Sequence, residues 1–152
     1  MSDQWSLWKR NVVDKYKSWP SESIKKDLQS NSNPFAVCME HWSGDFNIGT
    51  LIRNANVFNA KEVFYLGKKR FDPRGAVGSH HYVNITHLEN SYSSLYKLKK
   101  HYSFVAVDNN MPNTTKLAKF DWNILSKPPL FLFGEECSGL TDQVLKMADY
   151  II

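Results

Sequence analysis

From Pro34 onward, short apolar runs alternate regularly with segments of helical periodicity. The apolar runs have the length of buried strands and lie at 35–39, 61–67, 82–85, 102–108 and 130–133, with a last strand beginning at 149. The segments with helical spacing lie at 47–58, 91–101 and 142–147. Strands that alternate with helices predict an α/β fold, with a mainly parallel sheet covered by helices on both faces.

The first 33 residues have a different pattern, which predicts a helical extension. The apolar residues Trp5, Trp8, Val12, Val13 and Tyr16 approximate one face of a helix, and Pro20 interrupts it. A second short helix is expected over 21–29, with Ser21 or Ser23 as its N-cap, before a turn at 31–34. We therefore predict two parts, an N-terminal helical extension (1–33) and an α/β domain (34–152).

Composition excludes several classes of protein. With 42% hydrophobic and 14% aromatic residues, the chain is too apolar for intrinsic disorder. Its longest apolar run, 128–133, is far too short to span a membrane, and the N-terminus lacks the pattern of a signal peptide. Two distant cysteines, Cys38 and Cys137, indicate no disulfide framework, so we expect a soluble cytoplasmic protein. The net charge of +4 is compatible with nucleic-acid binding but equally with a solvated basic surface.

Common catalytic signatures are absent from the sequence. It has no dinucleotide-binding or phosphate-binding glycine loop, and no GxSxG turn for a nucleophilic serine. His80 and His81 are adjacent in a segment expected to be extended, where their side chains would point to opposite faces. No spacing typical of a metal site accompanies them, so we expect no metal.

Two segments combine residues in an unusual way. In 47–58, Asn47 stands at the start of a helix and Arg53 lies within an apolar stretch. Because a buried arginine needs an anionic partner, Arg53 should face a cleft or a ligand, or pair with a carboxylate. In 133–140, two glycines bracket acidic residues directly after a buried strand. Ligands bind at the carboxyl ends of such strands, although an ordinary glycine turn has the same pattern.

Together these segments resemble the TrmH (SpoU) family of SPOUT methyltransferases. The first has that family's Asn, Arg, Ala and Phe in order, and 131–140 is similar to its GxExxGL motif. Between them, 62–67 and 74–82 resemble the family's second strand and the segment that follows it. The resemblance covers about 35–152 and implies a fold of the trefoil-knot type. The third family motif, which is threaded to make the knot, would follow Ile152, so the resemblance implies an incomplete knot here.

The resemblance implies methyl transfer from S-adenosylmethionine to a ribose 2′-hydroxyl of RNA. Arg53 would contact the substrate and stabilise the forming alkoxide, while Asn47 and Glu136 would hold this arginine, with Arg53 and Glu136 as an ion pair. The residues expected to bind the cofactor lie at the ends of three strands: Val107, Asp108, Gly134, Glu135 and Ile152.

RNA binding needs a positive surface with groups on which bases stack. The best candidate is the basic loop, which we define as Lys68, Lys69, Arg70 and Arg74 and which has Phe71 and Tyr82 nearby. A second candidate set is Lys9, Arg10, Lys25 and Lys26. A solvated loop is the alternative for each.

Members of the family act as homodimers, so the resemblance implies a homodimer. We expect tRNA rather than rRNA as substrate, because the chain is small and has no separate RNA-binding domain. Two other readings stay open, a catalytically inactive RNA-binding relative and an unrelated α/β small-molecule enzyme.

Overall fold

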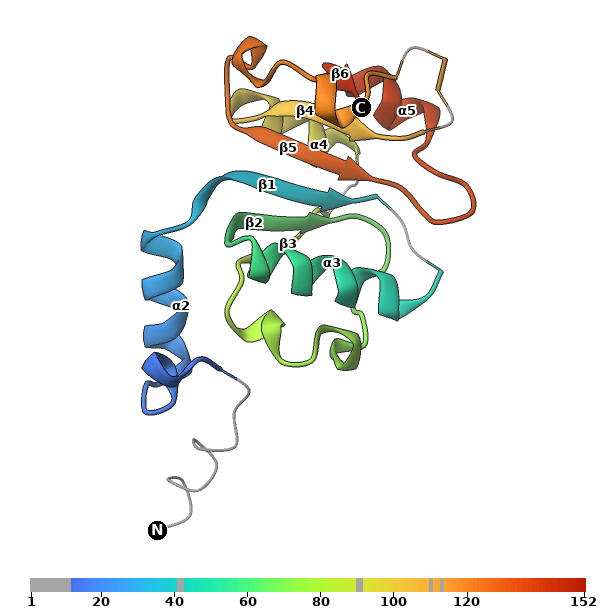
Figure 1. Cartoon of the computed structure of the whole chain (residues 1–152). Coiled ribbons are helices and arrows are strands. Elements are labelled where there is room, and N and C mark those ends of the chain that lie inside the picture. Colours follow the sequence, from blue (N-terminus) through green and yellow to red (C-terminus); the bar gives the residue numbers. More distant parts are fainter. Residues whose placement is uncertain (1–11, 41–42, 90–91, 110, 113) are drawn as a thin grey trace.

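A computed structural model describes residues 12–40, 43–89, 92–109, 111–112 and 114–152. Its centre is a six-stranded sheet in the order β3-β2-β1-β5-β4-β6, and all five strand pairings are parallel (Figure 1). The strands are β1 (Asn33–Met39), β2 (Ala60–Tyr65), β3 (Ile85–His87), β4 (Ser103–Val107), β5 (Pro129–Phe133) and β6 (Tyr150–Ile151). This arrangement confirms the predicted α/β class with a parallel sheet.

The sheet is buried on both faces, as β1 illustrates. Ala36 and Cys38 belong to one hydrophobic cluster, whereas Val37 and Met39 belong to the other. Successive side chains of a strand point to opposite faces, so a strand buried on both sides reads as a continuous apolar run. This is why the sequence pattern identified the strands well.

Helices cover the two faces unequally. On one face, α3 (Asp45–Val57) connects β1 to β2 and buries Ile48, Ile52 and Ala55. On the other face, the shorter α4 (Tyr92–Lys97) and α5 (Asp142–Met147) contribute Leu95 and Val144 to the core. Thr141 is the N-cap of α5, and its hydroxyl accepts a hydrogen bond from the Val144 amide. The described 3₁₀ segments are η1 (Asp14–Tyr16), η2 (Pro73–Ala76), η3 (Ser79–His81), η4 (Leu98–Lys100), η5 (Leu117–Lys119) and η6 (Trp122–Ile124).

The N-terminal extension contains α2 (Ser21–Ser30), which lies beside the amino ends of the strands (Figure 1). The side-chain amide of Asn59, just before β2, donates to the carbonyls of Leu28 (3.2 Å) and Asn31 (2.9 Å) and so joins the two parts. The predicted cap was wrong, because α2 begins at Ser21 and its N-cap is Pro20, which offers no side-chain acceptor. The predicted first helix lies mostly outside the described residues, and Tyr16 belongs to the short η1.

The segment before β3 differs from its prediction. It was expected to be extended from Tyr82, but the strand begins only at Ile85, and His80 and His81 lie in η3. The preceding Val77 and Gly78 both have positive φ (48° and 85°), which turns the chain tightly into the 3₁₀ segment. The two imidazole rings therefore do not point to opposite faces, and their centroids lie 4.0 Å apart.

Among the helices in the described part of the chain, none has the length and apolar character needed to cross a membrane.

Candidate functional site

The carboxyl ends of β5, β4 and β6 meet at one edge of the sheet, at the right in Figure 1. This edge brings together all five residues predicted to bind a cofactor: Val107, Asp108, Gly134, Glu135 and Ile152. All five are half-buried. The Asp108 amide donates to the Ile152 carbonyl (3.1 Å), which joins the ends of β4 and β6. The sequence prediction therefore selected residues that are neighbours in space.

The loop after β5 makes a narrow turn, which we call the cofactor loop (134–140) because two of the residues predicted to bind the cofactor, Gly134 and Glu135, lie in it. The amide of Glu135 donates to the Gly139 carbonyl (3.1 Å), and the amide of Gly139 donates back to the Glu135 carbonyl (2.8 Å). A Cβ atom on Gly134 would lie 2.0 Å from the carbonyl carbon of Gly139 and 2.3 Å from the amide nitrogen of Leu140. Only a glycine fits there, because the backbone itself occupies the space of a side chain.

The cofactor loop also closes against the end of β4. Gly139 has a φ of 68°, and a Cβ atom built on it would lie 3.0 Å from Oδ2 of Asp108. Glu135 is fixed within the loop, since its carboxylate accepts a hydrogen bond from the Ser138 hydroxyl (2.8 Å). The half-buried carboxylates of Asp108 and Glu135 give this edge negative charge, which suits a ligand with positive charge.

Glu40 is a component of this edge that the sequence reading missed. It directly follows β1, is only 3% exposed, and its amide donates to the Phe133 carbonyl (2.9 Å). Its carboxylate accepts hydrogen bonds from the Tyr92 hydroxyl (2.8 Å), the Thr141 amide (2.8 Å) and the Thr141 hydroxyl (2.5 Å). Its position in the sequence could have identified it. Like Asp108 after β4, Glu40 is an acidic residue that immediately follows a buried strand.

The three predicted catalytic residues are not in mutual contact within this chain. Asn47 is half-buried in the first turn of α3, Arg53 is exposed on the same helix, and Glu136 is exposed in the cofactor loop. Six positions on an α-helix correspond to about 1.7 turns, so Asn47 and Arg53 point in different directions. Among the described residues, no hydrogen bond or ion pair joins Arg53 to Asn47 or to Glu136, so the expected Arg53–Glu136 pair is not formed here.

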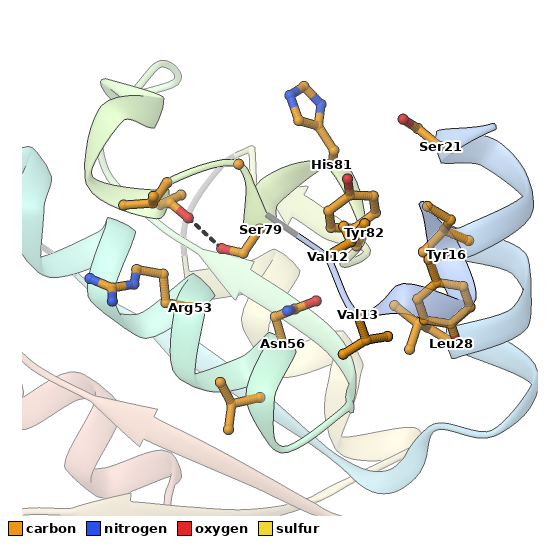
Figure 2. A pocket seen from close by; sticks show the side chains of 15 residues that line it. Val12, Val13, Tyr16, Ser21, Leu28, Arg53, Asn56, Ser79, His81 and Tyr82 are labelled. Carbon is orange, nitrogen blue, oxygen red and sulfur yellow. Dashed lines mark hydrogen bonds between the residues drawn. The ribbon is translucent and has the colours of Figure 1, made fainter. Parts of the chain in front are cut away.

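Arg53 borders a cavity of about 670 Å³ between the N-terminal extension and α3 (Figure 2). Arg53 was expected to be buried and to need an anionic partner, but its side chain is exposed and its guanidinium extends away from Tyr16, so only its position at the cavity's border bears on the predicted cleft. The cavity is lined by none of the five cofactor candidates, so in one chain it is separate from the carboxyl edge.

The basic loop follows β2 and is exposed at all four predicted positions. Lys69 pairs with Glu89 (3.2 Å) and Arg74 with Asp72 (2.5 Å), whereas Lys68 and Arg70 have no ion pair within the described residues. Phe71 was a candidate for stacking on bases, but its ring packs edge-on against Tyr65 and against the core beneath α3. Of the second basic set, Lys9 and Arg10 lie outside the described residues, while Lys25 and Lys26 lie on α2.

Neither the histidines nor the cysteines form a site in the described part of the chain. No cluster of three or more His, Cys, Asp or Glu side chains suited to a metal occurs there. Burial raises the pKa of the Cys38 thiol well above its usual range, so this residue is a neutral packing group in the core. Cys137 is exposed in the cofactor loop.

Residues 34–152 match the model of the SpoU rRNA Methylase family. The chain belongs to this family. No curated protein matches the sequence. The trefoil knot typical of SPOUT enzymes is not tested by the described residues and stays a prediction.

Solved structures of similar fold include several SpoU-type enzymes. The A. aeolicus TrmH/SpoU tRNA modifying enzyme is 20% identical, with a TM-score of 0.70 over 87% of this chain and 70% of that one. An AdoMet-bound rRNA methyltransferase from Sinorhizobium meliloti is 20% identical, with a TM-score of 0.66 over 82% of this chain and 49% of that one. The SpoU methyltransferase AviRb from Streptomyces viridochromogenes, in complex with AdoMet, is 21% identical, with a TM-score of 0.67 over 79% and 48%. The chain thus spans about half the length of the last two proteins.

Proposed function

We propose that this SpoU-family protein transfers a methyl group from S-adenosylmethionine to a ribose 2′-hydroxyl of RNA. The observation that carries the proposal is the family match across 34–152. Two of the structural neighbours, the rRNA methyltransferase and AviRb, have AdoMet bound. The carboxyl edge of the sheet in this chain has the close backbone approach of Gly134 to Gly139 and the carboxylate of Asp108.

The cofactor candidates fit the chemistry that a methyl donor requires. S-adenosylmethionine supplies an activated methyl group on a positively charged sulfonium. Gly134 lets the chain fold back tightly on Gly139 beside this edge, and the Asp108 carboxylate complements positive charge. Val107, Glu135 and Ile152 complete the walls of this edge.

Arg53 is proposed to act on the RNA. Its guanidinium carries a permanent positive charge and five donors, so it can bind the ribose oxygen as negative charge develops there. Proton abstraction by Arg53 is not expected, because a guanidinium with a pKa above about 12 is almost always protonated. Asn47 and Glu136 are proposed to position this arginine, and the basic loop to bind the RNA backbone.

A homodimer is proposed to complete the site. Arg53 lies apart from the cofactor candidates in one chain, and a second copy could supply its own carboxyl edge to this arginine. Phe46, in the first turn of α3, is 73% exposed and offers apolar surface for such contact. Of the two RNA classes, tRNA is proposed as substrate, and a tRNA modifying enzyme is among the structural neighbours.

The first experiment combines cofactor binding with product analysis. Calorimetric titration with S-adenosylmethionine should show binding, and incubation with unmodified tRNA or rRNA should give a 2′-O-methylated nucleoside, identified by mass spectrometry after digestion. Arg53→Ala should abolish transfer and leave cofactor affinity and the circular dichroism spectrum unchanged, whereas the neighbouring exposed Asn54→Ala should retain activity. RNA binding without cofactor binding would instead support the inactive relative.

Mixing two inactive variants tests the shared site. If Arg53 of one copy serves the cofactor edge of the other, Arg53→Ala mixed with Gly134→Val should regain activity in the heterodimer. No recovery, or a monomer by light scattering, would place the site within one chain.

A further inference from the structure

The cavity beside Arg53 has the size and walls of a ligand site. Its volume of about 670 Å³ lies within the range of about 300–1,000 Å³ common for pockets that bind small molecules. One wall comes from the N-terminal extension, through η1 and α2, and the other from α3 and the segment 76–82. Figure 2 shows Tyr16 and Leu28 on the first wall, with Asn56 and Ser79 facing them.

The wall formed by α3 carries unused polar groups. Arg53 and Asn56 are three positions apart, so they lie on the same side of the helix. In the described part of the chain, neither side chain has a hydrogen bond or an ion pair. Asn56 points into the cavity in Figure 2, whereas the guanidinium of Arg53 extends away from Tyr16, toward the cavity's edge.

The remaining surface suits a flat, largely apolar group. Tyr82 and His81 lie at one end of the cavity, and Tyr16 is held in place by a hydrogen bond from its hydroxyl to Asp27 (2.6 Å). Val57 and Val77 border the cavity although they are 74% and 64% exposed. Aromatic rings beside unpaired amide and guanidinium groups are the combination with which proteins bind unstacked nucleobases.

We propose that this cavity binds one unpaired nucleotide of the RNA substrate. The base enters between the two walls, stacks on Tyr82 and offers its edge to Asn56, while the sugar and phosphate stay at the mouth beside Arg53. The identification of the ligand as RNA rests on the proposed function. Because the N-terminal extension forms one wall, this part of the chain helps select the RNA.

The test measures binding of fluorescein-labelled single-stranded RNA homopolymers of A, C, G and U by fluorescence anisotropy. Asn56→Ala should weaken binding of the preferred homopolymer about tenfold, the effect of losing a base-edge contact. Tyr82→Ala should weaken binding of all four by a similar factor, through lost stacking. Two matched controls lie outside the cavity, Asn54→Ala on the same helix and Tyr96→Ala, which is 62% exposed on α4. These controls should stay within about twofold of the wild type, since surface changes away from a site have small effects.

Photocrosslinking with 4-thiouridine-substituted RNA gives a second readout that does not depend on the folding of variants. Crosslinked peptides should contain Tyr16, His81 or Tyr82. The inference is overturned if no RNA binds, if crosslinks fall only elsewhere, or if Asn56→Ala and Tyr82→Ala behave like their controls.

Cofactor titration separates this result from the proposed function. If the protein binds S-adenosylmethionine and methylates RNA while the cavity variants bind RNA normally, the inference fails and the proposed function stands. If RNA crosslinks in the cavity but no cofactor binds, the proposed function fails and the cavity belongs to an RNA-binding relative.

Discussion

The carboxylate of Glu40 accepts hydrogen bonds from both the amide and the hydroxyl of Thr141, the residue that caps α5. Glu40 directly follows the central strand β1, and Thr141 directly follows the cofactor loop. The pair therefore fixes the exit of that loop to the middle of the sheet. A third bond, from the Tyr92 hydroxyl, ties the start of α4 to the same carboxylate.

Replacing this carboxylate should cost both stability and cofactor affinity. Glu40→Ala leaves three partly buried donors, the Tyr92 hydroxyl and the amide and hydroxyl of Thr141, without their acceptor, and we expect the free energy of unfolding to fall by about 1–3 kcal/mol. Glu40→Gln, which keeps the shape but not the charge, should lose less. Urea denaturation followed by circular dichroism measures the stability of both variants, with the exposed Glu22→Ala on α2 as control, and calorimetric titration measures their affinity for S-adenosylmethionine. Equal stability of Glu40→Ala and the control would contradict this role.

The contact of Gly134 with Gly139 gives a second prediction. In Gly134→Ala the new methyl group would collide with backbone at 2.0 Å, so the cofactor loop must open. We expect a loss of about 1–3 kcal/mol in stability, together with weaker binding of S-adenosylmethionine. Gly44→Ala is the matched control, because a Cβ atom there meets nothing within 4 Å. The close approach would be refuted if both variants kept wild-type stability.

Asn59 should stabilise the fold in two ways that different substitutions can separate. Its φ of 47° is unfavourable for most side chains, and its amide holds the end of α2 through two hydrogen bonds. Asn59→Gly loses only the hydrogen bonds, whereas Asn59→Ala also has a strained backbone. The alanine variant should therefore be less stable than the glycine variant by about 1–2 kcal/mol. Thermal unfolding of both variants checks this, and an equal loss would show that the backbone strain is negligible.

His80 should make the fold sensitive to mild acid. Burial, and next the charge of His81, lower the pKa of His80 below its usual 6.5. The unfolded chain then binds the proton more readily, so stability present above pH 6.5 is lost as the pH falls through the lower pKa of the folded state. His80→Gln should reduce the drop in melting temperature between about pH 7.5 and 5.5, and the exposed His101→Gln should not. An unchanged drop in His80→Gln would rule out this origin.

The sheet and the grouping of the cofactor candidates at its carboxyl edge could be predicted because they follow from local patterns. Runs such as 35–39 and 130–133 are apolar throughout, since both faces of their strands are buried. Once the strands are parallel, the residues just after them meet at one edge, and Asp108 and Gly134 could be placed there from chain position alone.

Other features depend on contacts between distant segments and were not predictable in this way. Glu40 and Thr141 are adjacent only because β1 pairs with β5, and nothing in the local sequence of either indicates the other. The cavity beside Arg53 exists because η1 and α2 of the extension lie opposite α3 and the segment 76–82. The positive φ of Val77 is unusual for a β-branched residue. Residue propensities therefore could not predict the turn after which the rings of His80 and His81 lie close together.

The position of β1 in the middle of the sheet has a consequence for how the chain reaches its native state. Ala36 pairs with Glu62 on one side but with Leu130 on the other, so one edge of the first strand stays unpaired until nearly the whole domain has been synthesised. Such distant pairings slow folding and leave apolar strand edges open to other chains. During synthesis, an early strand therefore depends on residues near Leu130 for its second partner, and we expect the sheet to form late.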